Sequence, residues 1–158
     1  MPKKRNEPDS PLTLVNAQKK EKLPLPLLRE KAAAFMKILS QTKKHYLSAE
    51  TMVTFRFVDD KEICRWHRDY FQDPTPTDVI AFPIRDKVNL PLDPDLLGDV
   101  VISVETARRH SKQFGKSFED EVVLYMIHGV LHMLGYDDLE PEKKKVMDQL
   151  QFSLLRKV

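Results

Sequence analysis

The stretch HGVLHMLGYDD, residues 128–138, places two of the five histidines of the chain four positions apart. The sequence around them, from Val122 to Leu134, is apolar on nearly every side and predicts a buried helix. Residues four apart lie one helical turn apart, so His128 and His132 can direct imidazole nitrogens at one point, as a transition-metal ion requires. The same spacing occurs in pairs of hydrogen-bonded core histidines, and the pair alone favours neither interpretation.

Three residues near the pair favour a metal site. Gly129 lies mid-helix, where glycine costs about 1 kcal/mol relative to alanine, so we expect some group to approach the backbone closely there. Gly135 follows at a place where a helix can end in the left-handed conformation and the chain can turn back. Asp138 then offers a carboxylate as third ligand. Two imidazoles and one carboxylate leave coordination positions open on zinc or a similar ion, which is typical of a catalytic site.

The spacing H-x3-H-x2-G-x2-D resembles the zinc motif of the metzincin proteases, with aspartate as the last ligand. Those enzymes carry a general-base glutamate directly after the first histidine, and this chain has Gly129 there. Peptide hydrolysis by that mechanism therefore lacks its base, and a hydrolase of another bond is the weaker alternative.

The same stretch also resembles the signature of the YbeY family of bacterial endoribonucleases, H-G-x-L-H-L-x-G-Y-D-H. PTDVIAFP at 76–83 is similar to that family's P-T-D-V-L-S-F-P, and LGDVVIS at 97–103 is similar to its L-G-D-I-V-I-S. The likeness covers most of residues 50–140. It implies a single-domain, single-strand-specific and metal-dependent endoribonuclease that acts in ribosomal RNA maturation, chiefly at the small-subunit 3′ end, and in ribosome quality control.

The resemblance implies a metal site formed by His128, His132 and Asp138. The family has a histidine at the third position, so the carboxylate of Asp138 is a departure that lowers the net charge of the site and shifts its preference toward harder ions. One divalent ion, most simply Zn²⁺, is the expected cofactor. The expected partners are ribosomal RNA, the small ribosomal subunit and ribosomal proteins, and the alternative function is a non-catalytic maturation factor with a structural metal.

A second departure concerns catalysis. The arginine of the family's Y-R segment aligns with Phe71, so Arg68, three residues earlier, is the candidate catalytic residue, with Arg65 as an alternative. Asp78 and Asp137 are the candidate general bases. Each also has a structural interpretation, because Asp78 suits a turn cap and Asp137 suits a partner for a histidine N–H.

Binding of RNA also requires positive charge on the protein. The densest basic stretch outside the termini lies on the helix predicted at 105–114. Its Arg108, Arg109 and Lys112 are the candidate RNA-binding residues. A basic run is more often a solvated face, and the resemblance brings the two interpretations to about equal weight.

The elements that position these residues form an α+β fold, because predicted strands and helices do not alternate strictly. We predict a small four-stranded mixed sheet packed with about five helices, and the metal site on the long helix and the turn after it. The predicted strands lie at 12–16, 51–58, 78–84 and 98–103, and the predicted helices at 25–39, 60–70, 105–114, 118–135 and after Pro141. His45 and His67 have polar neighbours and are interpreted as surface residues.

The composition limits the other classes of function. With 158 residues and 41% hydrophobic content, one domain at 12–158 is expected after a polar, disordered lead at 1–11. A formal net charge of +2 excludes a strong field for wrapping DNA or binding an anionic membrane. One cysteine excludes an internal disulfide framework, and no apolar run approaches the roughly 18 residues of a membrane span. We therefore expect a cytoplasmic protein.

Overall fold

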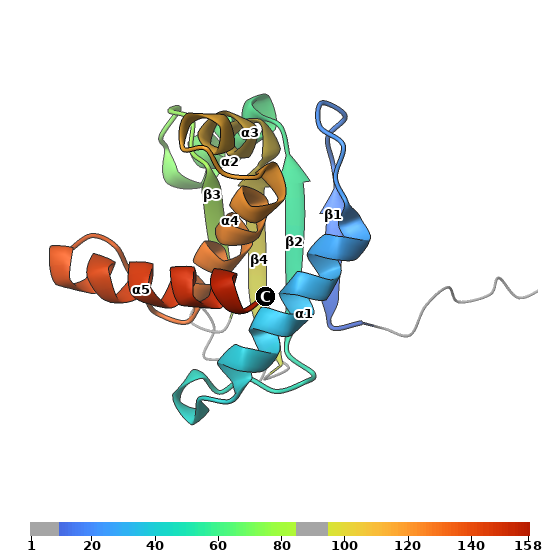
Figure 1. Ribbon diagram of the computed structural model, residues 1–158. Coiled ribbons are helices and arrows are strands. Elements are labelled where there is room, and N and C mark those ends of the chain that lie inside the picture. The colour runs from blue at the N-terminus through green and yellow to red at the C-terminus, as the bar shows by residue number, and fades with distance from the viewer. Residues whose placement is uncertain (1–9, 85–94) are drawn as a thin grey trace, which may run out of the picture.

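The computed structural model describes residues 10–84 and 95–158 (Figure 1). Most of the lead predicted to be disordered lies outside these ranges. The strands are β1 (Leu12–Asn16), β2 (Met52–Val58), β3 (Val79–Pro83) and β4 (Leu96–Ser103). The helices are α1 (Leu25–Ser40), the 3₁₀ helix η1 (Lys43–His45), α2 (Asp60–Phe71), α3 (Val104–Gln113), α4 (Phe118–Met133) and α5 (Pro141–Lys157).

The α+β class predicted from the sequence is confirmed, as is the mixed four-stranded sheet. The strand order is β1-β2-β4-β3, with β1, β2 and β4 parallel and β3 antiparallel to β4. Within the ranges that the structure describes, no helix combines the length and apolar character needed to cross a membrane.

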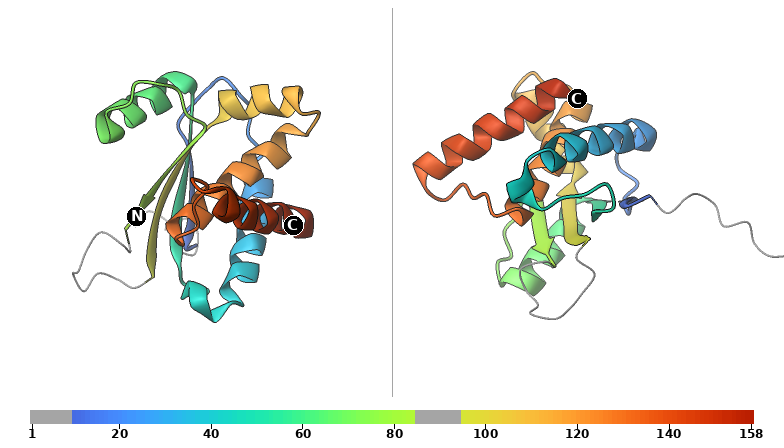
Figure 2. Two further views of the ribbon diagram at one scale, coloured as in Figure 1. Left: turned by 90° about the vertical axis from the view of Figure 1, so that its left-hand side faces the viewer. Right: turned by 90° about the horizontal axis from the view of Figure 1, so that it is seen from below.

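Helices cover both faces of the sheet. Val100 and Ile102 of β4 belong to the main core with α1 and α4, whereas Val101 between them belongs to a smaller core with Ile63 of α2. This alternation follows from the pleat, because successive side chains of a strand point to opposite faces. Figure 2 (left) shows α2 on one side of the sheet, with α1, α4 and α5 on the other.

The buried helix predicted around the two histidines is α4, and it packs directly on β4. A Cβ atom added to Gly129 would lie 2.4 Å from Cγ1 of Val100. The close approach expected at this glycine is therefore confirmed, and the group that approaches it belongs to the sheet. The absence of a side chain at Gly129 allows α4 to pack this closely on β4. This packing distance also determines how far the neighbouring His128 lies from the sheet.

Both ends of α4 follow the predicted local signals. At its start, Oγ of Ser117 accepts a hydrogen bond of 3.1 Å from the backbone N–H of Asp120. At its end, Gly135 has a φ of 97°, which favours glycine, and the N–H of Tyr136 donates to the carbonyl of Leu131. The chain therefore turns back over the last turn of the helix and carries Asp138 toward the histidines.

Candidate metal centre

The structure brings the three predicted ligands together. The Nε2 atoms of His128 and His132 lie 2.9 Å apart. One carboxylate oxygen of Asp138 lies 3.8 Å from Nε2 of His128, and the other lies 3.9 Å from Nε2 of His132. The ligand atoms of all three residues lie within 4.8 Å of one another. They form a group that could hold one metal ion.

The geometry of this group fits a divalent ion. Ligand atoms about 2.0–2.1 Å from a tetrahedral zinc ion lie about 3.4 Å from one another. The separations of 2.9, 3.8 and 3.9 Å fall on both sides of that value. The side chain of Asp138 is 38% exposed and that of His128 is 26% exposed, so solvent or substrate reaches the ligands. Two neutral nitrogen donors and one anionic oxygen therefore suit a cation with an open coordination position.

His128 is oriented by a residue that the sequence analysis missed. Nδ1 of His128 lies 2.9 Å from Oε1 of Gln151 on α5, and since an amide oxygen only accepts, the proton sits on Nδ1. This tautomer leaves the lone pair of Nε2 free for a metal. The Gln151 amide nitrogen in turn donates to Asp148 over 3.2 Å, and the other oxygen of Asp148 pairs with Lys144 over 2.7 Å.

A sequence signal for Gln151 does exist. On α5 it lies four residues after Met147 and three before Leu154, and both of these are fully or almost fully buried. Gln151 therefore occupies a core-facing position of an amphipathic helix, where a polar residue needs a hydrogen-bonding partner. Which partner it meets depends on how α5 packs on α4.

The second histidine is held in its neutral form. Burial lowers the pKa of the His132 imidazole, the neighbouring His128 lowers it further, and Asp138 acts in the opposite direction. The net effect is a pKa below the ordinary value of 6.5. A neutral imidazole is the form that binds a metal, so His132 needs to release no proton at neutral pH.

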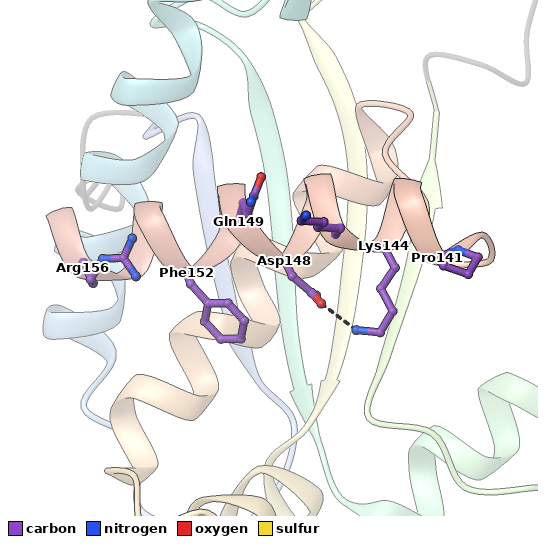
Figure 3. Close-up of a pocket in the computed structure, with 7 residues that line it drawn as sticks. Pro141, Lys144, Asp148, Gln149, Phe152 and Arg156 are labelled. Atoms are coloured by element: carbon purple, nitrogen blue, oxygen red, sulfur yellow. Dashed lines mark hydrogen bonds and ion pairs between the residues drawn. The ribbon is translucent and has the colours of Figure 1, made fainter.

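Two hollows border the ligands. The first, of about 420 Å³, is lined by His128 and Asp138 among other residues, and we call it the His128 hollow. The second, of about 370 Å³, is lined by His132, Phe71 and Ala81 among others, and we call it the His132 hollow. A larger hollow of about 540 Å³ runs along α5 but contains none of the three ligands (Figure 3). The three candidate ligands therefore border the two smaller hollows and not this one.

The candidate catalytic arginine lies apart from both ligand hollows. Nε of Arg68 is 3.0 Å from the carboxylate of Asp69, and Arg65 is 3.7 Å from Glu62. Neither arginine is among the described residues that line the two hollows. Phe71, which aligns with the arginine of the family pattern, does line the His132 hollow. A catalytic role for Arg68 stays a prediction.

The two candidate bases have structural contacts. Oδ1 of Asp78 accepts a 2.9 Å hydrogen bond from the backbone N–H of Val79, as a turn residue does, although Asp78 also lines the His128 hollow. Asp137 accepts a 3.3 Å hydrogen bond from the N–H of Leu139 and lies 3.6 Å from Lys143. The sequence suggests that Asp137 accepts a hydrogen bond from a histidine N–H. At His128 the acceptor is Gln151 instead.

The two arginines predicted to bind RNA hold parts of the fold together. Arg108 lies 3.0 Å from Glu21, and its guanidinium group sits 3.8 Å from the ring centre of Phe118. Arg109 forms a 2.6 Å ion pair with Asp60 at the start of α2. Lys112 is exposed on α3. RNA binding by Arg108, Arg109 and Lys112 stays a prediction.

The interpretation of His45 as a surface residue is wrong. Its side chain is buried, with Nδ1 2.9 Å from the carbonyl of Leu39 and Nε2 2.8 Å from the hydroxyl of Tyr136. The short 3₁₀ helix after α1 turns it inward, an element that polar neighbours did not reveal. Tyr136 belongs to the segment between Gly135 and Asp138, so this hydrogen bond anchors the loop that carries the third ligand. His67 is partly exposed.

Comparisons with known proteins show the family of the chain. The family profile described as Endoribonuclease YbeY matches residues 13–158. The Endoribonuclease YbeY of Syntrophotalea carbinolica is 39% identical over 122 residues, 77% of either chain. That of Carboxydothermus hydrogenoformans is 40% identical over 104 residues, covering 66% of this chain and 70% of the relative. That of Legionella pneumophila strain Corby is 41% identical over 113 residues, covering 72% and 70%.

A solved structure has the same fold. The solution structure of TM1509 from Thermotoga maritima matches with a TM-score of 0.62 and 23% sequence identity, covering 92% of this chain and 87% of that one.

Proposed function

The chain belongs to the YbeY family, and from this premise we propose that it is a metal-dependent endoribonuclease. The observation that carries the proposal is the convergence of His128, His132 and Asp138 on one point. We propose further that its substrates are single-stranded RNAs. It then acts in maturation of the small-subunit ribosomal RNA 3′ end and in ribosome quality control, and it is located in the cytoplasm. Its partners are then ribosomal RNA, the small ribosomal subunit and ribosomal proteins.

The proposed cofactor is one Zn²⁺ held by the three ligands, which supplies Lewis-acid chemistry at an RNA phosphodiester. Gln151 keeps the proton of His128 on Nδ1, so that Nε2 faces the ligand group. The left-handed turn at Gly135 and the hydrogen bond between Tyr136 and His45 hold the loop of Asp138. The residues around the ligands thus position donors before any substrate arrives, which lowers the cost of organising the site.

Positive charge for the substrate backbone is available beside the ligands. Lys116 and Lys144 line the His128 hollow. Binding of RNA phosphates by Arg108, Arg109 and Lys112 on α3 is a further part of the proposal. Replacing Lys112 by glutamine tests that part without breaking an ion pair of either arginine. If Lys112 neutralises one phosphate of a single strand, the salt slope of affinity should be shallower by about 0.7 in Lys112→Gln than in wild type.

One observation favours a second function. Phe71 occupies the place of the family's arginine beside His132 and carries no charge to stabilise a transition state. The second candidate is therefore a maturation factor that binds RNA without cutting it and uses its metal for structure.

The test combines metal content with RNA cleavage. Wild type, His132→Ala and Asp138→Ala are purified without chelator, and elemental analysis and cleavage of a single-stranded RNA are measured on the same samples. We expect about one ion per chain in wild type, its loss in both variants, and loss of cleavage with the circular dichroism spectrum retained. Asp120→Ala, which removes an exposed carboxylate at the other end of α4, is the matched control.

Full RNA cleavage by a folded His132→Ala protein would overturn the endoribonuclease proposal. Metal bound to wild type without cleavage of any single-stranded RNA would favour the maturation factor.

A further inference from the structure

One buried acidic group lies near the metal ligands without a role in holding them. Glu121 of α4 is only 5% exposed. Among the buried side-chain polar atoms of the described residues, its Oε2 alone lacks a hydrogen-bond partner. Burial of an unpartnered carboxylate oxygen is costly, because the oxygen gives up water and gains nothing in exchange. The chain therefore leaves an acceptor for a donor that comes from elsewhere.

Glu121 lines the His128 hollow together with donors and aromatic rings. Tyr125, one turn further along α4, lines the same hollow as Glu121. Its hydroxyl also lies 2.5 Å from Nδ1 of His110. Burial, followed by the charges of Asp78 and Glu121, raises the pKa of Tyr125, so the phenol keeps its proton. The lining of the hollow thus includes a neutral phenol as well as the Glu121 carboxylate.

The walls of the hollow suit a flat ring. Three aromatic side chains from three different parts of the chain line it, namely Phe114, Tyr125 and Phe152. Nζ of Lys116 lies 5.1 Å from the ring centre of Phe152. Figure 3 shows the side chains of Phe152, Asp148 and Lys144 projecting from the same side of α5. Single-stranded RNA is commonly bound by stacking unpaired bases on such rings, and a hollow of about 420 Å³ lies in the size range of ligand sites.

The hollow reaches the metal ligands. His128 and Asp138 line it as well. Glu121 precedes His128 by seven residues, or about 10 Å along the axis of α4. A base held at Glu121 would thus belong to a nucleotide next to the phosphate at the ligands, with Lys116 and Lys144 near its backbone.

We propose that the His128 hollow is a nucleobase subsite in which the Glu121 carboxylate selects bases that carry an amino group. This inference rests on the proposed endoribonuclease function, because it assigns RNA as the ligand. A carboxylate offers only acceptors, so it binds the amino groups of adenine, cytosine and guanine. The corresponding edge of uracil presents a single N–H donor between two carbonyl oxygens, and these oxygens repel the carboxylate on both sides of that donor. Uracil is therefore the base that the subsite binds least tightly.

Binding of the four ribonucleoside 5′-monophosphates tests the subsite without cleavage. Their dissociation constants are measured by NMR titration of wild type, Glu121→Gln and Asp120→Asn. We expect wild type to bind AMP, CMP and GMP about tenfold more tightly than UMP. Glu121→Gln adds an amide donor that pairs with a uracil carbonyl, so this variant should bind UMP more tightly than wild type does. The exposed Asp120 is the matched control, and its variant should keep the wild-type preference.

Cleavage of RNAs that differ at one base beside the cut site provides the second readout. Wild type should disfavour uracil there, and Glu121→Gln should lose that preference. Equal binding of all four nucleotides by wild type would overturn the subsite, as would an equal loss of all four in folded Glu121→Gln. Wild-type cleavage without a base preference would overturn the subsite and leave the endoribonuclease proposal standing. Preferential binding without cleavage would support the subsite and count against that proposal.

Discussion

Nδ1 of His128 donates a hydrogen bond of 2.9 Å to Oε1 of Gln151, which joins the central helix α4 to the last helix α5. The candidate metal centre is therefore built from three parts of the chain. α4 supplies two ligands, the loop after it supplies Asp138, and α5 fixes the direction of His128. Each part can be tested separately.

Gln151→Leu should weaken metal binding while the fold persists. Leucine fills a similar volume at a buried position, but it cannot hold the His128 ring in the tautomer that presents Nε2. Loss of such a partner typically costs 10–100-fold in metal affinity, and we expect a loss of about that size. Zinc competition with a chromophoric chelator measures it, and Gln149→Leu, on the exposed side of α5, is the control. Equal affinities for Gln151→Leu and wild type would show that His128 is oriented without Gln151.

Asp138→His should change which metal the site prefers. A carboxylate favours harder ions than an imidazole does, so the third ligand biases the wild-type site toward ions such as Mn²⁺ relative to Zn²⁺. We expect the ratio of Zn²⁺ affinity to Mn²⁺ affinity to be higher in Asp138→His than in wild type. Isothermal titration with each metal gives the ratio. A ratio that does not rise would mean that Asp138 does not coordinate the ion.

Gly129→Ala should destabilise the protein although alanine is the better helix former. The new Cβ would lie 2.4 Å from Cγ1 of Val100, so α4 has to move away from β4. Such overpacking costs about 1–3 kcal/mol in the free energy of unfolding. Adding Val100→Ala removes the clash, so the double variant should lose less stability than the sum of the two single variants. Urea unfolding of the four proteins measures this coupling, and strict additivity would contradict the assigned contact.

The pH dependence of stability should report on Asp60. Burial acts to raise the pKa of this carboxyl, but hydrogen bonds from Arg109, Ser103 and Thr106 outweigh it, so the pKa lies below 3.8. A carboxyl with a lowered folded-state pKa stabilises the fold above its unfolded pKa of about 3.9, and this stabilisation is lost as pH falls through the folded value. The free energy of unfolding should therefore fall less steeply below about pH 4 in Asp60→Asn than in wild type.

The control for that experiment is Asp69→Asn, because Asp69 is exposed and, among the ion pairs of the described residues, pairs only with its neighbour Arg68. It should follow the wild-type curve. Parallel curves for Asp60→Asn and wild type would show that Asp60 titrates alike in the folded and unfolded chain.

The parts of the site that could be predicted from sequence are those set by local geometry. His128 and His132 are one helical turn apart, and Gly135 reverses the chain before Asp138, so eleven consecutive residues determine the ligand set. Gln151 and Glu121 were missed because their roles depend on which side of one helix faces another. His45 was misjudged for the same reason, since its partner Tyr136 lies 91 residues away in sequence. The sequence predicts that Arg68 or Arg65 replaces the arginine of the family pattern. The structure instead places Phe71, the residue aligned with that arginine, in the same hollow as His132.

The bond between His128 and Gln151 also sets an order of events during synthesis. Gln151 follows His128 by 23 residues, so a ribosome adding about 5–20 residues per second makes it roughly one to five seconds later. Asp138 is added ten residues after His128, and from then until Gln151 the nascent chain contains all three ligands but lacks the residue that orients the first of them. Assembly of the centre therefore comes after the sheet and α4 have been synthesised.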